Sequence, residues 1–343
     1  MGVKLKQLRV DAGMTQAHVA GAVGVSQPNY QRWEVGSAPI PEDKLKKLAK
    51  ILKASPETIL GKHAPIEAAL YNSSVGEDLN YYGEVAVEFL GGGAPLLLSI
   101  SERAFRGLYR DLQNGESFVT VESLANQTVA IRTQAIADLY FSSEAYDYCG
   151  PQGTVFSDYP DHIDILMPDA RDWEIVEALD GGEVDEFNPA DVKRVSERIM
   201  ITDEQYAELV AEGKIKPEDL EKERESNQTE TDRIFKLAHE TTYQLSSGQR
   251  RSAYVDTPER LFNGFYELTD FDGGDSAGND MILLVAEGRH RTIFINKSAL
   301  DYVMIPTHKY IEGRIDATAE DLDAPKSTAK SPRKKVKLGV DGA

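Results

Sequence analysis

The sequence predicts a multidomain protein with an all-α head of five helices, an α+β body and a disordered C-terminal tail. Apolar residues recur at helical spacing in the first sixty positions, strand-like alternation occurs in two later stretches, and the last twenty positions hold few large apolar side chains. The expected segments are a head at 1–62, a linker at 63–82, a first α+β unit at 83–148, an acidic, partly helical insert at 149–249, a second α+β unit at 250–318 and a disordered basic tail at 319–343.

The charge of the chain is divided unevenly along its length. The 343 residues carry a formal net charge of −19, with 38 Lys and Arg against 57 Asp and Glu. Residues 1–62 hold ten bases and five acids, a net +5, and residues 324–343 hold six bases and one acid, also +5. The middle therefore carries −29. Taken whole, the chain would be repelled by a nucleic acid, but its basic ends can approach phosphate.

Several classes of protein are disfavoured by what the sequence lacks. The polar start is unlike a signal peptide, and no run approaches the ~18 apolar residues of a membrane span, so we expect a cytoplasmic protein with no membrane contact. The single cysteine, Cys149, excludes an internal disulfide and a cysteine-based zinc cluster. The six histidines lack metal-ligand spacing, and no phosphate-binding glycine loop occurs. We therefore expect no metal, no cofactor and no catalytic residues.

The head contains two helices of about eight residues joined by a tight turn. Thr15 is a good N-cap for a helix over 16–23, and Gly24 ends it at a position that favours a left-handed backbone. Ser26 precedes a third helix, in which Tyr30 and Trp33 at i, i+3 spacing face inward. This pattern is a helix-turn-helix unit. A preceding helix over 3–12, an amphipathic fourth helix beginning at 41 and a last turn at 55–60 complete the bundle.

Residues 3–61 resemble the Cro/CI-type (XRE family) DNA-binding domain. The match includes the Thr15-Gln16 start, the Gly24-Val25-Ser26 turn, and a Trp-Glu-x-Gly end at 33–36. The resemblance implies double-stranded DNA as the partner. It also implies that Gln27 and Arg32 occupy base-reading positions, and that Gln16 bonds a phosphate and braces Gln27.

The outer face of the third helix offers the side chains that could read a base sequence. In such a unit the N-terminal part of the second helix lies in the major groove. Gln and Asn can pair with adenine and Arg with guanine, whereas Pro28 offers no donor. Lys44 and Lys47 are candidates for backbone phosphate, and Lys4, Lys6 and Arg9 are expected on a solvated helix face. The expected DNA-binding residues are Gln16, Gln27, Pro28, Asn29, Gln31, Arg32, Lys44 and Lys47.

The body contains an internal repeat. Residues 101–146 align with 257–310, each copy reading as a helix followed by short strands, and the second copy carries an extra loop at 270–279. Between the copies lies the acidic insert, which reads either as a solvated helical segment or as a docking face for a basic protein partner. The basic tail reads equally as a flexible phosphate-binding arm or as a solubilising segment.

Three functions follow from these patterns. The first is a sequence-specific transcriptional regulator, expected to be a repressor that occupies an operator as a homodimer, with the body for dimerisation or for partner or effector binding. The second is an adaptor or antitoxin-like protein whose acidic body binds a basic partner and whose head only autoregulates. The weakest is a LexA-like autoproteolytic repressor using Ser276, because the candidate cleavage bond at 149–150 lies 127 residues from that serine.

Overall fold

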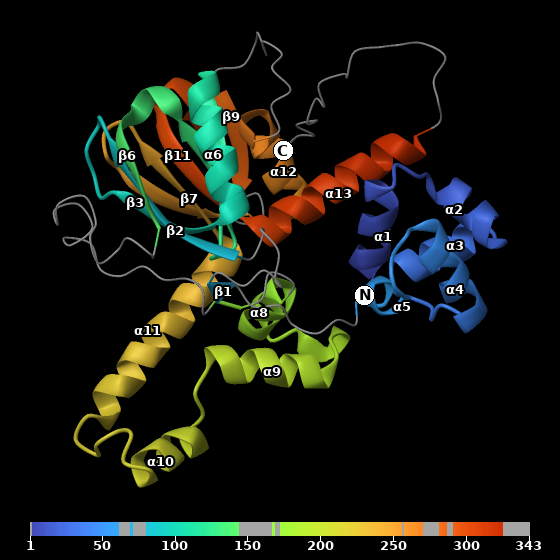
Figure 1. Ribbon diagram of the computed structural model, residues 1–343, viewed down its shortest axis with the longest axis horizontal. Coiled ribbons are helices and arrows are strands. Elements are labelled where there is room, and N and C mark those ends of the chain that lie inside the picture. Colours follow the sequence, from blue (N-terminus) through green and yellow to red (C-terminus); the bar gives the residue numbers. More distant parts are fainter. Residues whose placement is uncertain are drawn as a thin grey trace, which may run out of the picture. The chain divides into compact units, whose positions relative to one another are not determined.

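The computed structural model describes residues 2–61, 69–70, 80–143, 167–168, 172–255, 257–269, 281–286 and 291–324 (Figure 1). The chain divides into two compact units, which we call the head (residues 1–63 with 315–343) and the body (residues 64–314). Each is described by itself. The sequence prediction of an all-α head followed by an α+β body is confirmed.

The head is built from five short helices and the end of a sixth. The first five are α1 (Gly2–Asp11), α2 (Gln16–Val23), α3 (Gln27–Glu34), α4 (Glu42–Ile51) and α5 (Pro56–Ile59). The Thr15 hydroxyl accepts a hydrogen bond from the His18 amide, and Gly24 ends α2 with φ of 77°. From Ile315 onward, α13 (Thr307–Asp323) also belongs to the head.

Every one of the five short helices contributes to one apolar core. The fully or nearly fully buried side chains include Leu5, Val19, Tyr30, Leu48 and Ile59, one from each helix. Trp33 packs at the edge of this core with 8% of its surface exposed. The core therefore holds α2 and α3 in a fixed position relative to each other. A surface that both helices form keeps its geometry for this reason.

The body is organised around a largely antiparallel sheet. Its strands are β1 (Ala69–Leu70), β2 (Asn80–Phe89), β3 (Leu96–Ser101), β4 (Phe118–Ser123), β5 (Gln127–Arg132), β6 (Ile136–Ser143), β7 (Glu240–Leu245), β8 (Arg250–Tyr254) and β11 (Leu300–Pro306). Their order is β1-β2-β3-β4-β5-β11-β7-β8, with β6 also paired to β2. A separate antiparallel pair joins β9 (Met281–Ala286) to β10 (Arg291–Asn296).

The element order of the body recurs. Helix α6 (Glu102–Asn114) is followed by β4, β5, a 3-10 turn at Thr133–Ala135 and β6; helix α12 (Pro258–Thr269) is followed by β9, β10, a 3-10 turn at Lys297–Ala299 and β11. The pairings recur too, since β2 pairs with β3 and β6 as β7 pairs with β8 and β11. The two parts meet where β11 pairs with β5.

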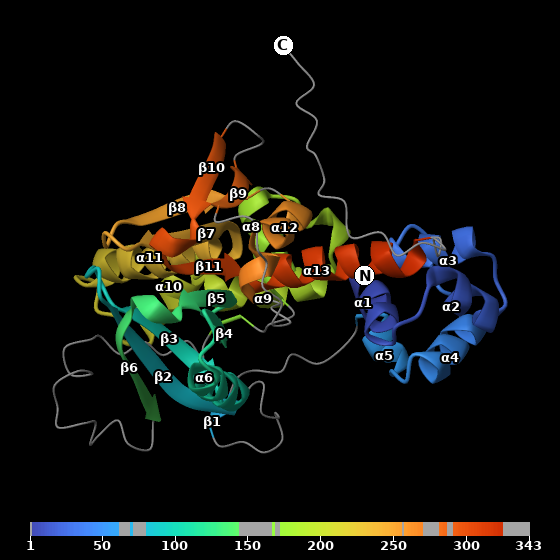
Figure 2. The same ribbon diagram turned by 90° about the horizontal axis from the view of Figure 1, so that it is seen from above.

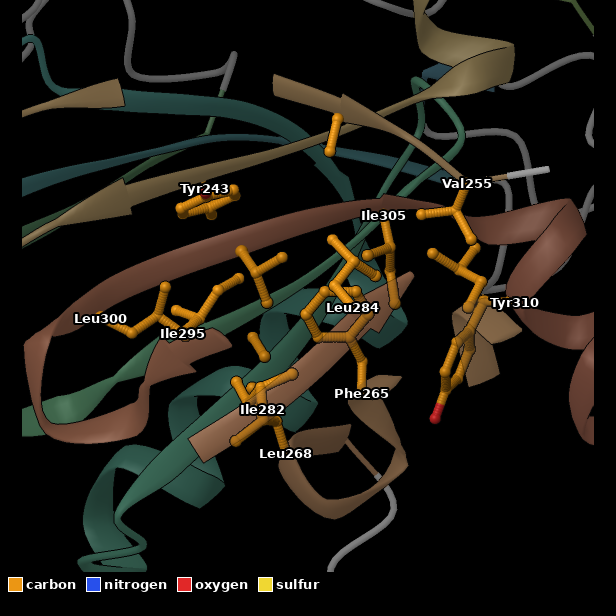
Figure 3. Close-up of a cluster of buried hydrophobic side chains, with 14 residues drawn as sticks. Tyr243, Val255, Phe265, Leu268, Ile282, Leu284, Ile295, Leu300, Ile305 and Tyr310 are labelled. Carbon is orange, nitrogen blue, oxygen red and sulfur yellow. The ribbon is translucent and has the colours of Figure 1, made fainter. Parts of the chain in front are cut away.

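Each of these two parts has its own apolar cluster. Helix α6 packs against β2, β3 and β4 (Figure 2). The apolar cluster of this part includes Val85, Leu98 and Leu108. The other cluster gathers Phe265 and Leu268 of α12 with side chains of β9, β10 and β11, among them Leu284, Ile295 and Ile305 (Figure 3). The similar helix-plus-sheet units are thus each centred on their own core.

The described part of the insert between the two parts is mainly helical. Its helices are α8 (Trp173–Gly181), α9 (Pro189–Ile199), α10 (Asp203–Ala211) and α11 (Leu220–His239). Helices α8, α9 and α11 contribute to a third apolar cluster of the body, in which Trp173 is 1% exposed. Arg194 of α9 donates two hydrogen bonds to Asp172, at 2.6 and 2.9 Å, which fastens α9 to the start of α8.

Two expected boundaries differ from the structure. The second α+β unit was expected to begin at residue 250, but its first hairpin begins with β7 at Glu240. The tail was expected from residue 319, but α13 continues to Asp323, because Ile315 and Ala319 bury an apolar stripe. Cys149, the loop at 270–279 with Ser276, and residues 325–343 lie outside the described residues.

Over the part of the chain that the structure describes, no helix has the length and apolar character needed to cross a bilayer. Within the same ranges, no three His, Cys, Asp or Glu side chains come together as a metal site.

Candidate nucleic-acid interface

The outer face of α3 is entirely polar apart from one proline. Tyr30 and Trp33 turn inward with their rings in an edge-to-face contact at 6.3 Å. Pro28 lies in the first turn, where its missing N–H costs no helical hydrogen bond. The predicted outward residues are all exposed: Gln27, Pro28, Asn29, Gln31 and Arg32. The helix thus presents amide and guanidinium groups on one side while the other side anchors it in the core.

Gln16, at the start of α2, is connected to α3 by both ends of its side-chain amide. Its Oε1 accepts a long hydrogen bond of 3.4 Å from Gln27 Nε2. Its Nε2 donates to Glu34 Oε2 at 2.7 Å. The carboxylate of Glu34 therefore fixes which end of the Gln16 amide faces Gln27, leaving the Gln27 oxygen pointed away from that bond.

A buried ion pair between Arg9 and Glu34 holds the carboxylate that binds Gln16. Arg9 Nε donates to Glu34 Oε1 at 2.6 Å, and Arg9 Nη1 donates to the Met14 carbonyl at 2.7 Å. Burial and the neighbouring Glu34 charge raise the pKa of Tyr30 above its usual value, so its hydroxyl stays protonated. The expectation that Arg9 lies on a solvated face is wrong. Arg9 follows Leu5 by four positions and shares its buried face, a spacing that could have indicated this.

A carboxylate of α13 lies at the N-terminus of α2. Asp323 Oδ1 accepts a hydrogen bond from the Gln16 backbone N–H at 2.7 Å. Its Oδ2 lies 3.1 Å from Arg9 Nη2, a charge contact without the alignment of a hydrogen bond. Two turns earlier on the same face of α13, Asp316 pairs with Lys6 at 2.5 Å. Sequence reasoning assigned residue 323 to the tail and gave no signal for these contacts.

The two lysines expected to contact phosphate differ in their surroundings. Lys44 is half-buried, and its Nζ lies 3.3 and 3.4 Å from the carbonyls of Val23 and Gly24, where it caps the C-terminus of α2. Lys47 is exposed on α4. Lys44 thus has a structural role in holding α2, whereas Lys47 is open to solvent.

Two successive helices, a glycine turn and a polar outer face on the second are the parts of a helix-turn-helix. A family model described as a helix-turn-helix domain matches residues 1–59. Residues 1–59 are a helix-turn-helix domain. The match covers under a fifth of the chain, so it speaks for the head alone. No curated protein and no solved structure matches the chain. In a helix-turn-helix domain the second helix, here α3, is the element that enters the major groove of DNA.

Proposed function

We propose that this protein is a sequence-specific transcriptional regulator of the Cro/CI type, which represses by occupying an operator as a homodimer. The observation that carries the proposal is the outer face of α3, where exposed polar side chains stand on a helix anchored by Tyr30 and Trp33. A solvated surface helix needs no bracing of its polar side chains. Gln27 is nevertheless braced by Gln16, which is itself held by Glu34.

Each side chain of this face has a chemical role in the proposal. Gln27 pairs with an adenine edge and Arg32 with a guanine edge in the major groove, since their donor and acceptor patterns match those bases. Gln16 contacts the phosphate backbone, as does the exposed Lys47, which sets the register of α3 in the groove. Asn29 and Gln31 reach either base or phosphate, and Pro28 contacts a thymine methyl.

The remainder of the chain supplies what one domain lacks. One short recognition helix reads few base pairs, so dimers that place two helices in half-sites about 34 Å apart gain both affinity and specificity. The body, within a middle segment of charge −29, provides the dimer contact or binds a basic partner or effector. Its charge also repels DNA and so suppresses non-specific binding, which leaves the affinity to the base-reading residues.

The test is in vitro selection of duplex DNA with the full chain, followed by titration of variants on the enriched site. We expect an inverted repeat to be enriched. Arg32→Ala should lose ~1–3 kcal/mol of binding free energy and relax one base position in each half-site. Lys50→Ala is the matched control, because it removes one exposed head charge from another helix and should leave base preference unchanged. Failure to enrich any sequence would overturn the proposal.

A further inference from the structure

The C-terminal end of α13 contacts the N-terminus of α2, and the proposed reading of DNA bases gives no reason for this contact. Asp323 receives the Gln16 backbone N–H on one carboxylate oxygen at 2.7 Å and faces Arg9 Nη2 with the other at 3.1 Å. This is the same Gln16 whose side chain braces Gln27 on the recognition helix. The carboxylate thus lies beside the residue that the proposed function assigns to a DNA phosphate.

The atoms around Asp323 form a site for an anion. The N-terminus of α2 presents backbone N–H groups that have no partner within the helix; that of Gln16 bonds Asp323 and that of His18 bonds the Thr15 hydroxyl. Together with the positive end of the helix dipole, such groups bind carboxylate and phosphate alike. A second donor faces the same point. Arg9 is 0% exposed, and its Nη2 has no aligned hydrogen bond, although its Nε and Nη1 are both engaged. A phosphate offers more acceptor oxygens than a carboxylate and can better satisfy this donor.

The last turn of α13 depends on the head for its stability. It carries Glu320, Asp321 and Asp323 and no basic residue, so its acids oppose the negative end of their own helix dipole. The contacts that compensate include the pairing of Asp323 described above, that of Asp316 with Lys6, and the burial of Ile315 and Ala319. Asp316, Ala319 and Asp323 recur at i, i+3, i+7 on one face. Among these contacts, the ones made by the Asp323 carboxylate can be replaced by a competing anion.

We propose that Asp323 is an internal stand-in for a DNA phosphate, so that operator binding must displace the end of α13 from the N-terminus of α2. This inference rests on the proposed function. The helix end lowers the affinity of the head for DNA. Any partner or effector that holds α13 away from α2 activates DNA binding, and any that stabilises the docked turn inhibits it.

The first test compares the affinity of full-chain variants for the selected duplex by fluorescence anisotropy. Asp323→Ala and Asp323→Asn should each bind about tenfold more tightly than the wild type, since a charge-assisted contact no longer competes. Glu320→Ala is the matched control, because it removes one exposed acid from the same turn. It should change affinity by less than about twofold, as expected for a loss of general repulsion.

A second test needs no DNA. In the Asp323→Ala chain, added inorganic phosphate should shift the NMR resonance of the Gln16 amide, whereas in the wild type that resonance should stay in place. Circular dichroism verifies that the variants are folded. If Asp323→Ala and Glu320→Ala bind DNA alike, or if phosphate leaves Gln16 unmoved in both chains, the stand-in role is wrong while DNA binding stands. If folded wild type and variants all fail to bind selected DNA, the proposed function itself fails, and the phosphate titration still reports on the anion site.

Discussion

Gly313 in α13 lies so close to Pro258 at the start of α12 that a Cβ added to it would be 2.2 Å from the Pro258 carbonyl oxygen. Both residues belong to the body. The close approach lets α13 pass over the first turn of α12, a geometry that no other residue type permits without a shift of the backbone.

We therefore expect Gly313→Ala to destabilise the body by ~1–3 kcal/mol in urea unfolding, because the added methyl overpacks against backbone that cannot yield. The control is Gly107→Ala in α6, whose Cβ would meet nothing within 4 Å. That substitution should stabilise by ~0.5–1 kcal/mol, through helix propensity alone. A gain of stability at both glycines would contradict the packing described for Gly313.

Two ion pairs of the head have the same N–O distance of 2.6 Å and opposite surroundings. Arg9 and Glu34 are buried, whereas Lys46 and Glu42 are exposed. We expect Glu34→Ala to cost ~3 kcal/mol of unfolding free energy, because it removes the closer of the two carboxylates that face the buried Arg9 and leaves the Asp323 contact at 3.1 Å. Glu42→Ala should produce no measurable change. Equal effects would show that burial does not decide the contribution of these pairs.

The insert should make the body sensitive to acid. Burial opposes ionisation of Glu177, but hydrogen bonds from His308 and Lys309 outweigh it and lower the pKa of Glu177 to about 2. Its contribution is therefore complete above pH 4.5, the ordinary value, and is lost as the pH falls toward 2. Burial also lowers the pKa of His239, so stability falls below pH 6.5 as the unfolded chain takes up that proton first.

The measurement is the urea concentration at the midpoint of unfolding, taken at a series of pH values from about 7.5 to about 3, a range that includes the ordinary pKa values of His and Glu. Glu177→Gln should reduce the decline of the midpoint below pH 4.5 and keep the decline that begins near pH 6.5. A wild-type midpoint that stays constant across the range would refute the assignment of both groups.

Asp301 of β11 is expected to hold the junction of the two repeated parts. It is 1% exposed, accepts from the Ser246 hydroxyl at 3.0 Å and from Gln244 Nε2 at 3.3 Å, and faces Arg132 of β5 at 3.7 Å. Asp301→Ala should cost ~1–3 kcal/mol, since it leaves Gln244 and Ser246 without this acceptor and removes the carboxylate that faces Arg132. Asp301→Asn keeps one acceptor oxygen and the side-chain shape, and should cost less. Equal losses in thermal or urea unfolding would indicate that the negative charge, which both substitutions remove, decides the contribution of this position.

The helices of the head were predictable because their signals are local. Thr15 and Gly24 bound α2, and the i, i+3 pair Tyr30 and Trp33 orients α3, all within a span of twenty residues. The ion pair of Arg9 was not predictable in the same way, because its partner lies 25 residues away and arrives there only when α1 and α3 pack.

Contacts between residues far apart in the sequence were harder to predict. The spacing of apolar residues indicated the repeated helix and strands of the body, but alternation within one strand does not reveal which strand it pairs with. The pairing of Ala130 with Val303, across 173 positions, follows from tertiary packing. Asp323 accepts a hydrogen bond from Gln16, 307 positions away in the sequence, and no motif at either residue predicts this contact. The outer face of α3 was readable from sequence, whereas the group that covers the start of α2 was not.

Each unit buries one of the two tryptophans of the chain, Trp33 in the head and Trp173 in the body. Indole emission shifts to longer wavelength when a buried ring meets water, so each ring reports the unfolding of its own unit. With Trp173→Phe the remaining emission follows the head, and with Trp33→Phe it follows the body. The molecule thus carries its own pair of optical labels, which can separate the melting of the two units in one intact chain.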